Sequence, residues 1–243
     1  MSDLALALDG STYFSSVALL RDGMLVAEGQ VPEGVHEKQS GRGEALVPLI
    51  EDMVAANGIR LTELSSIICG AGPGSFTSLR VAASVAKGIG FASGAKMYAV
   101  SSLLLTFGGS RVPLEDGNYI SVLPAMRGEL FALPVELKFG IPTPTATAHS
   151  ILSEMELRDR ARETQSAIIG PGQEIEANPH AKGCGVQLSD AASGPSRKNQ
   201  NAGLYTSILA SGAIDLDSWE PDYGRLAEAQ VKWEATHGRP LRA

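Results

Sequence analysis

The sequence predicts an α/β protein of two domains, and three observations support that prediction. Three short apolar segments near the start are joined by tight turns, which is typical of antiparallel strands. Two later apolar strands flank a helical segment, an arrangement that predicts parallel pairing across a helical crossover. A hairpin near the middle of the chain repeats the opening one in outline. With 243 residues, the chain has the length of two ordinary domains.

Composition excludes several classes of protein. Apolar residues make up 44% of the chain and charged residues 19%, which predicts a packed core and no extensive disorder. A net charge of −7 and an aromatic content of 5% disfavour an RNA-binding module that acts alone. Cys69 and Cys184 lie far apart, which favours reduced thiols over a disulfide frame or a zinc site. With Asp3 and Asp9 in its first segment and no long apolar run, we expect a cytoplasmic protein without a membrane segment.

The first 60 residues predict three antiparallel strands followed by a helix. The turn pair Asp22-Gly23 reverses the chain between the second and third strands. The strands are expected at Leu4–Leu8, Ser15–Leu20 and Met24–Gly29. Five apolar residues at helical spacing, Leu46, Leu49, Ile50, Met53 and Val54, then predict a helix that Asn57-Gly58 ends.

The most informative segment is a strand, a glycine-rich bend and a helix within LSSIICGAGPGSFTSLRVA, residues 64–82. Leu64–Cys69 is apolar enough for an interior strand, and the following glycines allow a sharp turn and a close approach. Ser75 or Thr77 can cap the helix that begins near Phe76, so its free N–H groups would face the bend. Such a helix start favours an anion, above all a phosphate. The candidate anion-binding residues are Asp9, Gly72, Gly74, Ser75 and Thr77.

A steric explanation of the same glycines remains open at this level. The bend lacks the Gly-Lys-Ser/Thr ending of a P-loop, and no acid lies between Glu63 and Glu115 to hold a ribose. The acid-free segment is locally basic, which could steer an anionic ligand or an acidic partner, or could simply be a solvated face. Its cations are Arg80, Lys87, Lys96 and Arg111.

The helix after the bend has a narrow face of small residues, which would let another helix approach closely. That face either packs inside the domain or joins the preceding helix in a surface for a partner. The candidate interface residues are Leu46, Leu49, Ile50, Met53, Leu79, Ala82, Ala83 and Ala86.

The remaining elements continue the α/β order. A strand at Lys96–Val100 and a short helix from Ser101 precede the second hairpin. That hairpin is expected at Tyr119–Leu123 and Glu129–Leu137, with an extended loop or sheet edge at Ile141–Thr147. Further along we expect a helix at Ile151–Arg162, a strand at Ala167–Ile169, mostly loop at Asn178–Asn201, and helices at Ala202–Ser211 and Tyr223–Glu234.

Three segments together resemble the bacterial TsaB family, also called YeaZ. They are DGSTYFSSVALLRDG from Asp9, GPGSFTSLRVAASVAKGIGFASG followed by YAVSSL, and the tail PDYGRLAEAQVKWE from Pro221. The resemblance implies the two-domain fold of the actin, sugar kinase and Hsp70 (ASKHA) superfamily, with ribonuclease-H-like sheets. On that basis we expect a first subdomain at 1–105, a second, smaller one at 106–220, and a C-terminal helix and tail at 221–243.

The resemblance also implies a function. It suggests a non-catalytic subunit of the bacterial complex that makes threonylcarbamoyladenosine (t6A) at position 37 of tRNA. Such a subunit would bind the catalytic protein TsaD through its first-domain helices, alongside the ATPase subunit TsaE. It would meet tRNA only through the complex and could form a homodimer when alone. No cofactor is expected, with ATP or ADP bound at most weakly or at the complex interface.

The chain departs from the superfamily's catalytic pattern in ways that support this interpretation. Asp9 stands where active members position metal and phosphates, but one acid without companions is better explained as stabilising its own turn. Where the family usually has Asp-Ala-Arg-Arg-Gly-Glu, Pro124 replaces the aspartate in the run that ends at Glu129. Ser78 replaces a common glycine and would narrow a phosphate approach. TsaD binds metal through two histidines four residues apart, whereas His36 is followed by Ser40. We therefore expect no catalytic or metal-binding residue.

Two enzymatic alternatives stay open. The first is an ATP-dependent phosphotransferase or hydrolase that uses Asp9 and the Gly72–Thr77 loop. The second is a weak hydrolase or protease with Ser75 near a helix N-terminus that could form an oxyanion hole. The protease is disfavoured because His36 is a candidate base by topology only, and His149, His180 and His237 are isolated.

Overall fold

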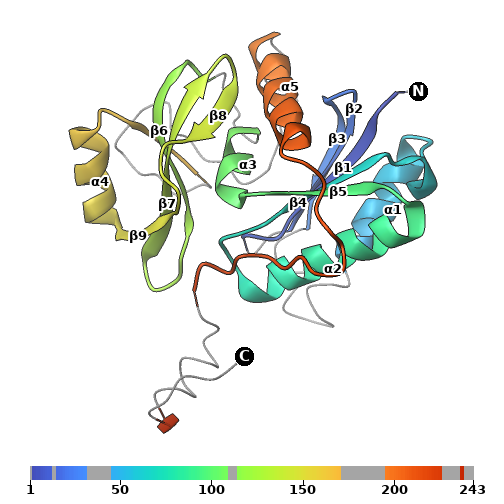
Figure 1. Ribbon diagram of the computed structural model, residues 1–243, viewed down its shortest axis with the longest axis horizontal. Coiled ribbons are helices and arrows are strands. Elements are labelled where there is room, and N and C mark those ends of the chain that lie inside the picture. The colour runs from blue at the N-terminus through green and yellow to red at the C-terminus, as the bar shows by residue number, and fades with distance from the viewer. Residues whose placement is uncertain are drawn as a thin grey trace.

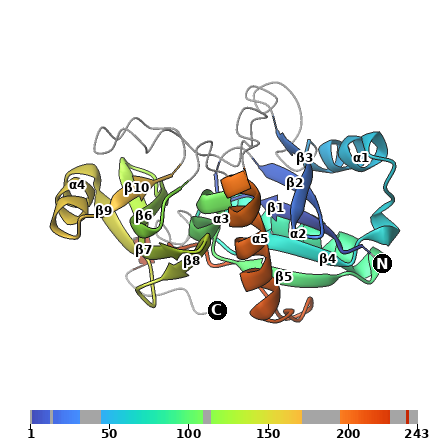
Figure 2. The same ribbon diagram turned by 90° about the horizontal axis from the view of Figure 1, so that it is seen from above.

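A computed structural model describes residues 2–12, 15–31, 45–108, 114–170, 195–225 and 236–237, and it shows two lobes side by side (Figure 1). Each lobe is built on a five-stranded sheet. The predicted two-domain α/β organisation is therefore confirmed. Helices α3 (Ser102–Gly108) and α5 (Pro195–Ala210) lie between the lobes, as seen from above in Figure 2.

The first sheet has the predicted strands in the order β3-β2-β1-β4-β5. Strand β1 pairs antiparallel with β2 and parallel with β4, and β4 pairs parallel with β5. Parallel pairing requires the crossover helix that the sequence places between residues 70 and 96. The strands span Leu4–Asp9 (β1), Ser16–Arg21 (β2), Met24–Gln30 (β3), Ser66–Gly70 (β4) and Lys96–Val100 (β5).

The two faces of this sheet are covered by different helices. Alternation along β1 sends Leu4, Leu6 and Leu8 into a core shared with α1 (Leu46–Ala56) and α2 (Phe76–Ser93). A single 3₁₀ turn at Leu61–Glu63 (η1) precedes β4. On the opposite face, Ala5 and its neighbours pack against α5. Small residues on that face leave room for the helix to approach closely.

The second sheet is centred on the hairpin of β6 (Gly117–Pro124) and β7 (Glu129–Lys138), as the sequence predicts. Strand β8 (Ile141–Pro144) forms the expected sheet edge, and β10 (Ala167–Ile169) pairs parallel with β6. The prediction of a helix at Ile151–Arg162 placed its start too early, because the helix begins only at Glu154. Residues Ser150–Ser153 form strand β9 on β7, and the Ser153 side chain caps α4 (Glu154–Glu163) by accepting from Glu156 N.

Residues after 195 correct three further expectations. Helix α5 begins at Pro195, so the loop predicted up to Asn201 is wrong from Pro195 onward, while 178–194 lie outside the described residues. Leu204, Ile214 and Trp219 pack on the first lobe. These residues therefore belong with the first lobe and not with a second domain at 106–220. The helix predicted from Tyr223 does not begin there, because residues 221–225 are irregular, and 226–234 lie outside the described residues.

Across the described ranges, no helix combines the length and apolar character needed to span a membrane.

Candidate functional site

Asp9 ends β1 at the junction of three segments, and its carboxylate accepts hydrogen bonds from neighbouring protein groups. Its Oδ2 accepts from the Ser11 hydroxyl at 2.6 Å, and its Oδ1 accepts from the Ser11 amide at 3.3 Å. The Ser102 hydroxyl, at the start of α3, donates to the same Oδ1 at 2.7 Å. Ser102 Oγ also accepts from the amide of Gly72 at 3.0 Å. Asp9 therefore ties the end of β1 to the glycine bend and to α3.

Burial makes the charge on Asp9 costly. Its side chain is 7% exposed, and desolvation raises its pKa, although the hydrogen bonds from Ser11 and Ser102 oppose that rise. The carboxylate also lies against Gly70, where a Cβ atom would overlap it. An acid that is closed in by backbone and hydroxyl donors is suited to stabilising its turn. This geometry favours the structural interpretation of Asp9 over a metal-positioning role.

We expect Asp9→Asn to fold and to change how stability depends on pH. The unfolded carboxyl titrates near 3.8, and the native pKa is higher, so the native state keeps its proton longer. The free energy of unfolding of the wild type should therefore fall as pH rises from about 3.8 through the native pKa. The asparagine side chain cannot ionise, so the free energy of unfolding of this variant should not fall over that pH range. Its amide can still form a hydrogen bond with the Ser11 hydroxyl.

Urea unfolding between pH 3.5 and 7 checks this prediction. Asp9→Ala is the comparison, because it leaves the Ser11 and Ser102 donors without an acceptor and should cost about 1–3 kcal/mol. Identical pH profiles for wild type and Asp9→Asn would contradict the assigned shift.

Gly72 and Gly74 of the bend each lie against the backbone of another segment. A Cβ atom at Gly74 would overlap the carbonyl oxygen of Ser11, and one at Gly72 would overlap that of Asp222. Gly72 also has a φ of +90°, which side-chain-bearing residues rarely adopt. The Ser75 amide donates to Ser11 O at 2.8 Å. Both flanks of the bend are therefore covered by the chain itself, which supports the steric explanation of its glycines.

The start of α2 lacks the arrangement of a nucleophile and a base that hydrolysis requires. Ser75 occupies the N-cap position as expected, but its side chain makes no capping hydrogen bond. Its hydroxyl lies 3.1 Å from that of Ser78, which is buried, and Thr77 is exposed. The partner of Ser75 is thus another hydroxyl and not a base. His36, the candidate base, lies outside the described residues, and His149 packs edge-on against Phe131 at 5.2 Å between ring centroids.

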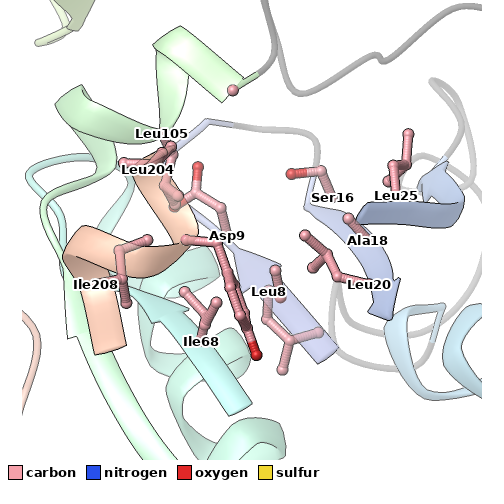
Figure 3. Close-up of a pocket in the computed structure, with 13 residues that line it drawn as sticks. Leu8, Asp9, Ser16, Ala18, Leu20, Leu25, Ile68, Leu105, Leu204 and Ile208 are labelled. Atoms are coloured by element: carbon pink, nitrogen blue, oxygen red, sulfur yellow. The ribbon is translucent and has the colours of Figure 1, made fainter. Parts of the chain in front are cut away.

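A cavity of about 70 Å³ lies beneath α5, a feature that sequence reasoning missed. Its lining is almost entirely apolar, with Asp9 and Ser16 among the few polar residues around it (Figure 3). Small side chains such as Ala7 and Ala18 on this face of the first sheet leave the space open. The alternation of these small residues with large ones along β1 and β2 is the sequence pattern that could have indicated the cavity.

The structure corrects the predicted partner surface. The face of α2 formed by Leu79, Ala82, Ala83 and Ala86 is at most 5% exposed. The face of α1 is also turned inward, and every residue proposed for it is buried or, for Leu49, partly buried against the core: Leu46, Leu49, Ile50 and Met53. The prediction fails because small residues let α2 lie close to the strands of its own sheet, as when Gly90 contacts Ile67.

The outward side of α2 carries a different stripe. Arg80, Ser84, Gly88 and Phe91 recur every three or four residues and are all exposed. Phe91 is 74% exposed, and nothing lies within 4 Å of a Cβ built at Gly88. Val47 is an exposed apolar residue on α1, which covers the same sheet face. We call these four α2 residues the outer stripe.

Two cations of the locally basic segment lie over aromatic rings in the fold. Arg80 lies over the Phe76 ring at 5.2 Å, and Lys87 lies over Trp219 at 6.0 Å. The segment that carries Trp219 is acidic, and Asp215 has a lowered pKa, caused chiefly by hydrogen bonds from Ser218 and Asp217, with Lys87 contributing. Arg111 lies outside the described residues.

Thiol and metal chemistry find little support in the part of the chain that is placed. Cys69 is a buried free thiol, and burial raises its pKa to about 12, which leaves it a poor nucleophile. Among the described residues, no group of three or more His, Cys, Asp or Glu could hold a metal ion. Cys184, His180 and Ser40 lie outside those residues.

The run from Pro124 to Glu129 is attached to the segment that follows α5. Pro124 ends β6, and Glu129 begins β7 and forms an ion pair with Arg225. The sequence placed Glu129 within a motif and Arg225 within the tail, but nothing in the sequence paired them. Their partnership is the second feature that sequence reasoning missed.

Comparisons with known proteins agree with this fold. Residues 26–132 match the family model for TsaD, the tRNA N6-adenosine threonylcarbamoyltransferase. The protein named tRNA threonylcarbamoyladenosine biosynthesis protein TsaB of Haemophilus influenzae is 29% identical over 126 residues, which is 52% of this chain and about half of that protein's length, 51%. Its namesake from Bacillus subtilis is 25% identical over 232 residues, covering 94% of this chain and 96% of that one.

A solved structure supports the fold at full length. The crystal structure of a Pseudomonas aeruginosa protein described as similar to peptidase YeaZ aligns with a TM-score of 0.64 and 24% identity. It covers 92% of this chain and all of that one. The duplicated sheets and this likeness confirm the predicted ASKHA fold. The chain is thus similar in sequence to proteins named TsaB and similar in fold to a YeaZ-like structure.

Proposed function

We propose that this chain is a non-catalytic subunit of the machinery that makes threonylcarbamoyladenosine in tRNA, and that it supports the catalytic protein TsaD by binding it. The names of its relatives in Haemophilus influenzae and Bacillus subtilis support the pathway. The enclosed Asp9 and the self-covered glycine bend support a binding role over a catalytic one. TsaE would complete the assembly, and tRNA would reach this chain only through the complex.

The observation that carries the proposal is the outer stripe of α2. Ser84 and Gly88 are exposed, with open space at Gly88, and Phe91 on the same stripe is a large exposed apolar side chain. Large exposed apolar groups beside a surface that admits close packing are typical of protein interfaces. The stripe replaces the buried residues as the proposed TsaD contact, and it would pair two copies of this chain when TsaD is absent.

Ser84→Arg tests this surface. A long cation in the middle of the outer stripe should hold a partner helix away and weaken the complex with TsaD by at least about tenfold. The change should leave the fold intact because Ser84 is exposed. Calorimetric titration with purified TsaD from the same organism gives the affinity, and light scattering gives the mass of the isolated chain.

Met155→Arg is the matched control, since Met155 is 72% exposed on α4 of the second lobe. It should bind TsaD like the wild type. Full affinity of Ser84→Arg would show that the outer stripe is not the contact.

The proposal also assigns no nucleotide to the isolated chain, because its own backbone covers both flanks of the glycine bend. Binding of Mg-ATP to the isolated chain that weakens in Asp9→Ala would instead favour the phosphotransferase alternative.

A further inference from the structure

The segment Pro221–Arg225 lies across the outer flank of the glycine bend. After α5, the chain runs past α2 and reaches toward the second lobe (Figure 1). The Asp222 amide donates to the carbonyl oxygen of Ala71 at 2.7 Å. The Asp222 carbonyl lies so close to Gly72 that no side chain would fit between them. This segment therefore covers the side of the bend that residues 9–11 do not.

An aromatic contact fixes the segment to the first turn of α2. The rings of Tyr223 and Phe76 are 4.4 Å apart between centroids and tilted by 45°. Arg80 lies over the same Phe76 ring. Aromatic pairs and cation–π contacts of this kind are attractive in addition to the apolar area that they bury. The Tyr223 side chain thus helps to hold a segment whose backbone makes few hydrogen bonds.

A second attachment joins the segment to the other lobe. Arg225 forms an ion pair with Glu129 at the start of β7. Gly224, with a φ of +70°, fits between Pro73 of the bend and the Phe131 ring of β7. The Asp222 carboxylate accepts from the Gly224 amide at 2.8 Å, which stabilises that turn. Five consecutive residues therefore contact the bend, the α2 helix and the second sheet at once.

We propose that Pro221–Arg225 is a clasp that closes the outer flank of the glycine bend and holds the second lobe against it. Irregular segments with few backbone hydrogen bonds open at lower free energy than the elements they cover. Because Gly224 contacts both sides and lies between the residues that make the two attachments, releasing the second-lobe contact also loosens the cover over the bend. The clasp makes access to the bend depend on the position of the second lobe, and it requires neither TsaD nor nucleotide.

Hydrogen exchange of the full-length chain tests this coupling. In Tyr223→Ala/Arg225→Met, amides of residues 71–76 should exchange about tenfold faster, along with those of 221–225. Amides of α1 should keep their wild-type rates, which separates clasp opening from general destabilisation. The control is Arg158→Met, which removes the partner of Glu154 within α4 and should leave residues 71–76 unchanged.

A charge-swapped pair tests the second-lobe attachment by itself. Arg225→Glu alone should speed exchange at residues 71–76, and Glu129→Arg in the same chain should restore slow exchange. If exchange rises only within 221–225 while residues 71–76 keep their wild-type rates, the segment is a local tail contact and the clasp is overturned. Failure of the swapped pair to restore protection would equally overturn the attachment.

Discussion

Leu79→Glu is expected to unfold the chain and not merely to weaken a partner contact. Leu79 is fully buried beneath the first turn of α2, near the backbone of Gly10. The substitution removes a fully buried apolar side chain and places a carboxylate at a position without access to solvent. The combined loss should exceed about 5 kcal/mol, which approaches the whole stability of a typical domain.

Circular dichroism and urea unfolding check this result, with Leu79→Ala as the comparison. The alanine variant creates a cavity without a buried charge and should cost about 2–5 kcal/mol. A folded Leu79→Glu protein with wild-type stability would mean that α2 turns its Leu79 face outward. Because the unfolded variant would also lose its binding to TsaD, this substitution cannot identify an interface. Ser84→Arg can, because it should leave the fold intact.

Gly72→Ala is the second large effect we expect, and it should destabilise the chain by about 3 kcal/mol or more. Two separate costs combine at this position. The φ of +90° strains any residue with a side chain, and the new methyl group would overlap the Asp222 carbonyl. Denaturant unfolding gives the loss in free energy, and the hydrogen exchange of residues 221–225 shows whether the clasp is displaced.

Gly88 within α2 and Gly94, which follows α2 as its C-cap, separate these two costs. Gly94, the C-cap, has a φ of +73° with open space around it, so Gly94→Ala should show the backbone strain alone, about 1 kcal/mol. Gly88 is helical and also open, so Gly88→Ala should stabilise the chain by about 0.5–1 kcal/mol. A loss at Gly72→Ala no larger than at Gly94→Ala would show that the Asp222 segment gives way at no cost.

Local patterns were sufficient to predict most of the first lobe. Apolar segments separated by turn residues located β1, β2 and β3, and the run of small residues after Phe76 located α2. These elements are set by interactions between residues close in the chain, such as the Asp22-Gly23 turn, so a single sequence carries their signal. The second lobe was predicted less well because β9 depends on pairing with β7, a strand that is not its neighbour in the chain.

Such patterns could not predict what covers the apolar face of a helix. Leu79 and Ala83 form an apolar stripe whether they meet their own sheet or a partner, so the sequence left both outcomes open. The fold decided it by laying α2 across β1 and β4, which buried that stripe and exposed Ser84, Gly88 and Phe91.

The sequence by itself determined the α/β order, the glycine bend and the place of Asp9, because each rests on local geometry. Only the tertiary structure decided what these features do. It brought Ser102 to Asp9 across 93 residues of chain, and it joined Asp222 to Gly72 and Arg225 to Glu129. Contacts of such long range follow from how the whole chain packs, and packing is a property of all the elements together.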